Sequence, residues 1–176
     1  MKEKPTLETQ TNYKELLNHI TTFVLDVDGV LTDGSIQVST NGDLLRTMNI
    51  KDGYAMKKAV KAGYTVCIIS GGKNEGVRKR LQGLGITDIH LGVEDKTENL
   101  DEFFDVYSID PQTVAYMGDD IPDIYPMQMI GLPCCPQDAV SEVKAISKYV
   151  SHKNGGKGCV RDIIEQVMKV QGKWTI

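Results

Sequence analysis

The sequence lacks the features that mark several broad classes of protein. No apolar run approaches the roughly 18 residues of a membrane span, and none follows the polar residues 1–6, so we expect neither a span nor a secretory signal. It also lacks an excess of positive charge: 20 Lys and Arg stand against 24 Asp and Glu, a net charge of −4. That balance argues against non-specific binding of nucleic acid.

Cysteine is scarce and poorly spaced for a structural role. The chain has 4 cysteines, of which Cys134 and Cys135 are adjacent, and no C-x-x-C pair occurs. Neighbouring cysteines do not form an ordinary disulfide, and a zinc site built on C-x-x-C is excluded. We therefore expect reduced thiols and a cytoplasmic protein.

What remains is enough for one folded domain. The chain has 176 residues, of which 40% are hydrophobic and 25% charged, a composition typical of globular proteins. We expect residues 1–11 to form a loose segment and residues 12–176 to form a single domain.

Strand-like and helix-like patterns alternate along that domain. Alternation of this kind predicts an α/β fold with a mostly parallel, doubly wound sheet. Around Asn41 and Gly42 two short strand-like runs predict a β-hairpin insert over residues 35–50, and residues 152–176 form a glycine-rich tail followed by a helix. The expected strands are 21–27, 64–69, 88–91, 113–117 and 132–135, and the expected helices are 13–19, 52–62, 74–84, 97–107, 140–146 and 160–170.

Polar side chains gather where the predicted strands end. In open parallel sheets, ligands bind at the carboxyl ends of the strands, so residues there converge on one volume. The residues at these ends are Asp26 and Asp28 after the first strand, Ser70 after the second, Lys96 after the third, and Asp119, Asp120 and Asp123 after the fourth.

Such a cluster of carboxylates needs either a proton or a cation. Two unit charges about 4 Å apart repel by roughly 4 kcal/mol at an effective dielectric constant of 20. Oxygen ligands without His or Cys select a hard cation such as Mg²⁺, which commonly binds one or two carboxylates together with a substrate phosphate. An aspartate can attack phosphorus, a second can exchange the proton of the leaving group, and a lysine with a hydroxyl can hold the phosphoryl oxygens. Each motif alone also fits a turn or a helix cap, but their combination favours a phosphoryl-transfer site.

These motifs resemble those of the haloacid dehalogenase superfamily. They are DVDGVLTDG over residues 26–34, Ser70-Gly71, Lys96, and GDDIPD over residues 118–123. The long first motif, the hairpin and the tail GGKGCVRDIIE are similar to the capless subclass that contains the KDO (3-deoxy-D-manno-octulosonate) 8-phosphate phosphatases, from about Thr21 onward. The resemblance implies a Rossmann-like parallel sheet, with the five expected strands in the order 5-4-1-2-3 and no cap domain.

The resemblance also implies roles for the clustered residues. Asp26 would be the nucleophile and Asp28 the general acid and base. Mg²⁺ would be held by the Asp26 carboxylate, the Asp28 backbone carbonyl and Asp119. The supporting residues would be Asp120 and Asp123 beside the metal, and Ser70, Gly71 and Lys96 on the phosphate.

Substrate and assembly are likewise implied by the resemblance. It implies hydrolysis of a sugar-acid phosphate, KDO 8-phosphate in lipopolysaccharide sugar synthesis. It further implies a homotetramer in which the hairpins pack centrally and a neighbouring subunit, including its tail, covers the open site. The substrate-binding candidates are Thr32, Asp33, Lys73, Arg80, Lys157 and Arg161.

One departure keeps alternatives open. Gly72 stands where KDO 8-phosphate phosphatases usually carry Arg, whereas relatives acting on KDN 9-phosphate have Glu there and Lys at the position of Gly83. A phosphatase acting on KDN 9-phosphate or another sugar-acid phosphate is therefore the alternative enzyme. A non-catalytic oligomerisation module is the alternative of another class, although it would have no need of the acid cluster.

Overall fold

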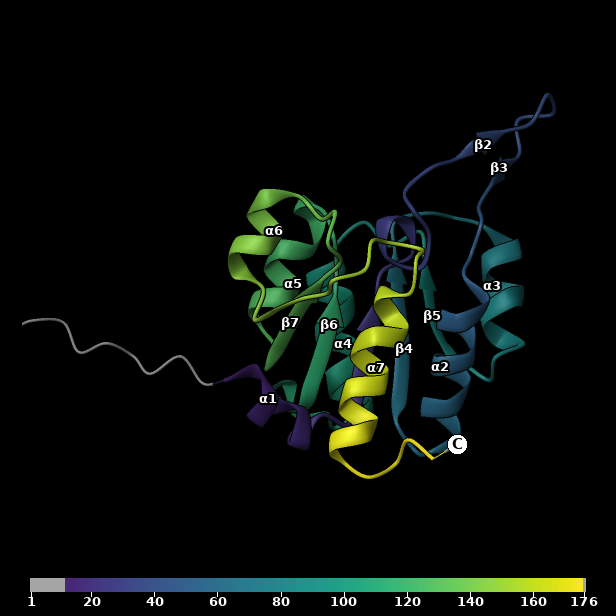
Figure 1. Cartoon of the computed structure of the whole chain (residues 1–176). Coiled ribbons are helices and arrows are strands. Elements are labelled where there is room, and N and C mark those ends of the chain that lie inside the picture. The colour runs from purple at the N-terminus through teal and green to yellow at the C-terminus, as the bar shows by residue number, and fades with distance from the viewer. Residues whose placement is uncertain (1–11, 176) are drawn as a thin grey trace, which may run out of the picture.

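The fold is a twisted parallel sheet with helices on both faces (Figure 1). The computed structural model describes residues 12–175, so the expected loose segment 1–11 lies outside the described residues. The strands are β1 Thr22–Leu25, β2 Gln37–Val38, β3 Leu44–Leu45, β4 Thr65–Ser70, β5 Asp88–Leu91, β6 Val114–Met117, β7 Leu132–Cys135 and β8 Tyr149–Val150. The helices are α1 Tyr13–Leu16, α2 Ile50–Lys61, α3 Glu75–Gln82, α4 Lys96–Tyr107, α5 Ile124–Gln128, α6 Ser141–Ile146 and α7 Cys159–Val170.

The order of the main sheet is β5-β4-β1-β6-β7-β8, and all its pairings are parallel. This confirms the expected order of the five predicted strands. The prediction missed β8, a two-residue edge strand whose Tyr149 pairs with Cys134. Its brevity explains the omission, since two residues carry no periodic signal. The sheet order reverses between β1 and β6, which places the predicted switch point at these two strands.

Two apolar layers hold the helices to the sheet. On one face, side chains of β1 and β4 such as Phe23 and Ile68 pack with residues of α2, α3 and α7. On the other face, Val24 and Tyr116 pack with residues of α4, α5 and α6. Consecutive residues of β1 therefore enter different cores, which is why the whole strand is buried.

The predicted hairpin insert is present but short. Its strands β2 and β3 pair antiparallel over two residues each, with Gln37 opposite Leu45. Figure 1 shows the hairpin extending away from the body of the molecule. Its apolar side chains are exposed, with Val38 at 70% and Leu45 at 52% of full accessibility.

Two further findings concern the sequence-based expectations. All 4 cysteines are buried and unpaired, as expected. No helix within residues 12–175 is long and apolar enough to cross a membrane.

Candidate active site

The first acidic motif begins where β1 ends. The Asp26 N–H donates to the Met117 carbonyl at 3.1 Å, which extends the β1–β6 pairing by one residue. The chain then makes a tight helical turn over Val27–Leu31, in which Gly29 has a φ of +86°. A Cβ on Gly29 would lie 1.9 Å from Asp119 Oδ2. Glycine therefore gives this turn its conformation and lets the acid after β6 approach it closely.

A buried lysine joins the two acidic motifs. Lys96 Nζ, at the start of α4, lies 2.7 Å from Asp123 Oδ1 and 3.0 Å from Asp26 Oδ2. The Tyr116 hydroxyl donates to Asp123 Oδ1 at 2.9 Å, and the Asp119 N–H donates to Asp123 Oδ2 at 3.1 Å. Both oxygens of Asp123 are thus engaged by the protein, so this residue suits a supporting role.

The electrostatic environment shifts the proton affinity of the site. Burial, together with the neighbouring Asp123 carboxylate, raises the pKa of Asp26 from 3.8 to about 6. Burial and the charges of Asp26, Asp123 and Asp120 raise the pKa of Asp119 to about 7. For Lys96, burial works to lower the pKa, but Asp26 and Asp123 outweigh it and raise the pKa above its usual value.

This arrangement fits a hard cation. Carboxylate oxygens of Asp26, Asp119 and Asp123 lie within 4.8 Å of one another. Asp119 Oδ1 is buried without a hydrogen-bond partner. An orphaned buried carboxylate oxygen is costly unless a cation or a proton compensates it.

An open pocket of about 420 Å³ lies above these groups. It is lined by every residue predicted to act in catalysis, phosphate binding or metal binding. Glycines and three residues absent from the prediction complete the lining. The predicted residues are Asp26, Asp28, Ser70, Gly71, Lys96, Asp119, Asp120 and Asp123, and the others are Gly29, Gly34, Gly72, Val93, Glu94 and Pro122.

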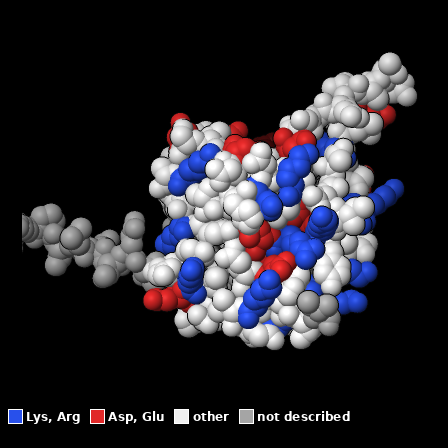
Figure 2. Space-filling view, in the orientation of Figure 1, with Lys and Arg blue, Asp and Glu red and all other residues white. Residues whose placement is uncertain are grey.

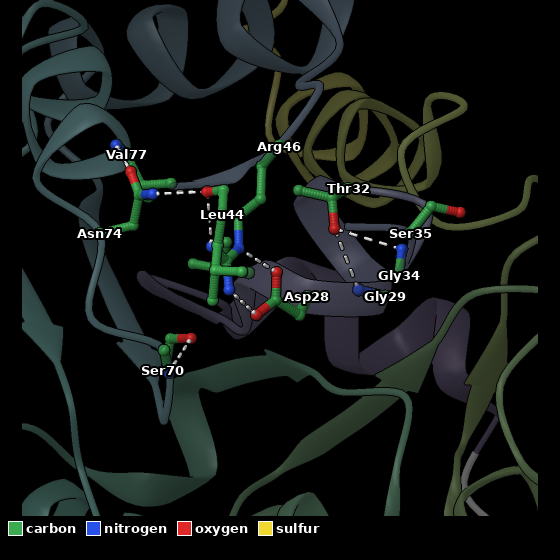
Figure 3. Close-up of polar contacts among 12 residues, drawn as sticks. Asp28, Gly29, Thr32, Gly34, Ser35, Leu44, Arg46, Ser70, Asn74 and Val77 are labelled. Carbon is green, nitrogen blue, oxygen red and sulfur yellow. Dashed lines mark hydrogen bonds and ion pairs between the residues drawn. The ribbon is translucent and has the colours of Figure 1, made fainter. Parts of the chain in front are cut away.

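Three of the six substrate-binding candidates lie on or near the loop after β1. None of the six candidates is among the described residues that line the pocket. Thr32 is fully buried, and its hydroxyl accepts hydrogen bonds from the Gly29 and Gly34 N–H groups, so it shapes the loop (Figure 3). Asp33 pairs with Lys157 at 3.2 Å on the surface.

The other three candidates lie elsewhere on the surface. The Lys73 side chain lies against Gly92, and Arg80 lies against Gly53 beside a second hollow. Arg161 pairs with Glu165 at 2.9 Å in a third hollow, which Lys157 also lines. Figure 2 shows basic and acidic side chains interspersed on the face that carries α7. Substrate binding by these residues stays a prediction.

Sequence reasoning missed Arg46. Its guanidinium donates from Nε to Asp28 Oδ1 at 2.6 Å and from Nη2 to Asp28 Oδ2 at 2.9 Å (Figure 3). The available signal was a single charged residue, Arg46, in the otherwise uncharged run from Leu44 to Met48 after the hairpin turn.

The glycine-rich tail packs against the catalytic loop of its own chain. The Gly156 N–H donates to the Val30 carbonyl at 2.9 Å, and a Cβ on Gly155 would lie 1.9 Å from the Gly29 carbonyl oxygen. The side chain of Asn49 also donates to the Gly156 carbonyl at 3.1 Å. These contacts tie the tail to the loop that carries Asp28.

Comparison with known proteins shows which family the chain resembles. Residues 89–163 match the model of the haloacid dehalogenase-like hydrolase family. The chain is 36% identical over 155 residues, 88% of its length, to the 3-deoxy-D-manno-octulosonate 8-phosphate phosphatase of Salmonella typhi, of which 82% is covered.

Solved structures extend the likeness to the fold. The 3-deoxy-D-manno-octulosonate 8-phosphate phosphatase of Yersinia pestis superposes with a TM-score of 0.90 at 31% identity, covering 93% of this chain and 88% of that one. The enzyme of Moraxella catarrhalis, in complex with magnesium, phosphate and KDO, gives a TM-score of 0.88 at 31% identity, covering 92% and 94%. The chain therefore belongs to the 3-deoxy-D-manno-octulosonate 8-phosphate phosphatase family of haloacid dehalogenase-like hydrolases.

Proposed function

We propose that this chain is a Mg²⁺-dependent phosphatase that converts KDO 8-phosphate to KDO and inorganic phosphate. The observation that carries the proposal is the meeting of Asp26, Asp28, Lys96 and Asp119 in one pocket. The name of the Salmonella relative and the ligands of the Moraxella structure support the substrate and the metal.

The chain's own residues supply the reaction in two steps. A carboxylate oxygen of Asp26 attacks phosphorus, the ester P–O bond breaks, and Asp28 gives a proton to the departing sugar oxygen. In the second step Asp28 takes a proton from water as that water attacks phosphorus. The bond from phosphorus to Asp26 then breaks, which releases phosphate, restores the Asp26 carboxylate and leaves Asp28 protonated as at the start.

Other residues orient the phosphoryl group. Lys96 is buried between Asp26 and Asp123, so its charge sits beside the attacking carboxylate. The Ser70 hydroxyl is buried in the pocket wall and accepts a hydrogen bond from the Gly72 N–H at 3.2 Å. We infer that these groups hold the phosphoryl oxygens, because fixed donors stabilise the charge that develops on them.

The residues present fit Mg²⁺. We infer that Asp26, Asp119 and the Asp28 backbone carbonyl bind it, with Asp120 and Asp123 supporting them. Bound Mg²⁺ neutralises the phosphate charge and the like charges of the acids.

We also infer a wider organisation. Residues 12–176 act as one cytoplasmic domain and assemble as a homotetramer through the exposed hairpin, so that a neighbouring subunit covers the pocket. The apolar side chains Ile36, Val38 and Leu45 support this, since exposed apolar patches mark contact surfaces. Figure 2 shows that the projecting hairpin carries few charged side chains.

The test measures phosphate release from KDO 8-phosphate and KDN 9-phosphate side by side, with Mg²⁺ and with EDTA. We expect Mg²⁺-dependent release from KDO 8-phosphate, abolished by Asp26→Asn and unchanged by Asp101→Asn on the exposed face of α4. Preference for KDN 9-phosphate would support the phosphatase chemistry but contradict the proposed substrate. Absence of release from both and from a panel of phosphate esters would favour the oligomerisation module.

A further inference from the structure

The Arg46 side chain, at the end of the hairpin, is buried against the loop that carries Asp28. Arg46 follows β3 directly, and its side chain is only 6% exposed, whereas the Asp28 side chain that it binds is 33% exposed. The cation is therefore covered while the carboxylate faces the pocket, of which Asp28 forms part of the lining. Figure 3 shows the guanidinium approaching Asp28 from the hairpin side.

The absence of a side chain at Gly72 makes room for this contact. A Cβ on Gly72 would lie 3.1 Å from Arg46 Nη2 and 3.2 Å from Asp28 Oδ2. Nearby, the side chain of Asn74 donates to the Leu44 carbonyl at 2.9 Å, which ties the foot of the hairpin to the start of α3. The backbone that carries Arg46 is thus held in place next to the pocket.

Arg46 lies behind Asp28 and is not part of the pocket lining. Among the described residues that do line it, Lys96 is the one cation, and it is bound to Asp26 and Asp123. We propose that Arg46 is a positioning residue that fixes the Asp28 carboxylate for proton exchange with the leaving oxygen. The inference rests on the proposed function, in which Asp28 serves that oxygen.

The geometry explains how such positioning works. A carboxylate has about four lone-pair sites, and a guanidinium fork occupies two of them, one on each oxygen. The remaining sites stay free to meet a group in the pocket. Arg46 itself neither gives nor takes a proton: the ester P–O bond breaks, and the proton passes from Asp28 to the sugar oxygen. In the first step a misplaced Asp28 therefore harms only those substrates whose leaving oxygen needs a proton, whereas the second step, in which Asp28 takes a proton from water, is the same for every substrate.

The experiment compares two leaving groups. Wild type, Arg46→Gln and Arg46→Lys are assayed on KDO 8-phosphate, whose sugar oxygen needs a proton as it leaves, and on p-nitrophenyl phosphate, whose phenolate leaves without a proton. We expect Arg46→Gln to lower kcat for KDO 8-phosphate by about 10- to 100-fold, within the range of general acid catalysis. KM for KDO 8-phosphate and kcat/KM for p-nitrophenyl phosphate should stay within about twofold, because kcat/KM reports only the steps up to departure of the leaving group. Arg46→Lys keeps the charge but loses the fork, so it should recover part of the loss.

Controls separate this role from a structural one. Arg78→Gln removes an arginine that pairs with Glu75 on α3, away from the pocket. It should leave the activity on both substrates unchanged. Thermal unfolding shows whether each variant is folded, and if Arg46→Gln is not, Arg46→Lys carries the same comparison.

Four results would overturn the inference. They are equal losses of kcat/KM on both substrates, a rise in KM alone, no change at all, and no recovery by Arg46→Lys. Failure of the proposed function is distinguishable, because wild type would then release no phosphate from KDO 8-phosphate.

Discussion

Lys96 Nζ lies 2.7 Å from Asp123 Oδ1, and both side chains are almost completely buried. The pair also connects the start of α4 to the turn after β6, two segments that are 27 residues apart in the chain. Asp123 thereby fixes the lysine beside Asp26, and its loss would leave a buried charge with one partner fewer.

Asp123→Asn is therefore expected to lower the free energy of unfolding by about 3 kcal/mol, since removing one partner of a buried ion pair is strongly destabilising. It should also reduce phosphatase activity, because Lys96 and the Asp119 N–H lose their common anchor. Urea denaturation measures the first effect. Glu75→Gln, which breaks an exposed pair with Arg78, is the matched control and should leave stability nearly unchanged. Equal urea midpoints for Asp123→Asn and Glu75→Gln would contradict the role given to Asp123.

The metal-free protein is expected to lose stability as the pH rises from 5 to 8. The folded pKa of Asp26 is about 6 and that of Asp119 about 7, both above the ordinary value of 3.8. The folded state therefore binds more protons than the unfolded state between about pH 4 and 7, so stability is present at low pH and is lost through this window. Thermal unfolding in EDTA across this pH range measures the loss.

Added Mg²⁺ should restore stability most strongly at pH 8, because the cation replaces the missing protons. Asp119→Asn should weaken the pH dependence of the melting temperature in EDTA and abolish the rise in melting temperature that Mg²⁺ causes. Asp101→Asn should behave as wild type. A melting temperature in EDTA that rises toward pH 8, or an unchanged Mg²⁺ response of Asp119→Asn, would refute this assignment.

Gly155→Ala is expected to detach the tail from the catalytic loop. The new Cβ would lie 1.9 Å from the Gly29 carbonyl oxygen, a backbone atom that cannot move without shifting the loop. We expect a loss of about 1–3 kcal/mol, as for other overpacked sites, with a parallel fall in kcat. Gly83→Ala is the control, since its Cβ would make only ordinary contacts at the end of α3. Full activity of Gly155→Ala would mean that the tail contact is dispensable.

Val38→Asp is expected to break the proposed tetramer. The side chain is 70% exposed on the hairpin, so a charge there would not disturb the fold of a single chain but would be costly in an apolar interface. Light scattering coupled to size exclusion should show a smaller particle, with lower phosphatase activity if a neighbour covers the pocket. Val106→Asp alters an equally exposed valine on α4 and should keep the wild-type mass. A wild-type mass for Val38→Asp would refute assembly through the hairpin.

The sequence by itself determined the sheet and the acids at its edge. Runs rich in β-branched and aromatic residues, such as residues 21–27, are long enough to predict buried strands, and parallel strands bring their carboxyl ends to one edge. For that reason the order of residues along the chain is enough to assign Asp26, Ser70, Lys96 and Asp119 to one site, and all of them line the pocket.

Only the tertiary structure decided which partners those residues take. The contact of Arg46 with Asp28 depends on how a hairpin of two-residue strands leaves the body, and no periodic pattern encodes that direction. The packing of Gly155 on Gly29 joins segments more than a hundred residues apart. Local patterns specify which face of an element is buried, whereas such contacts arise only when whole elements pack together, because their energy depends on the fit of distant surfaces.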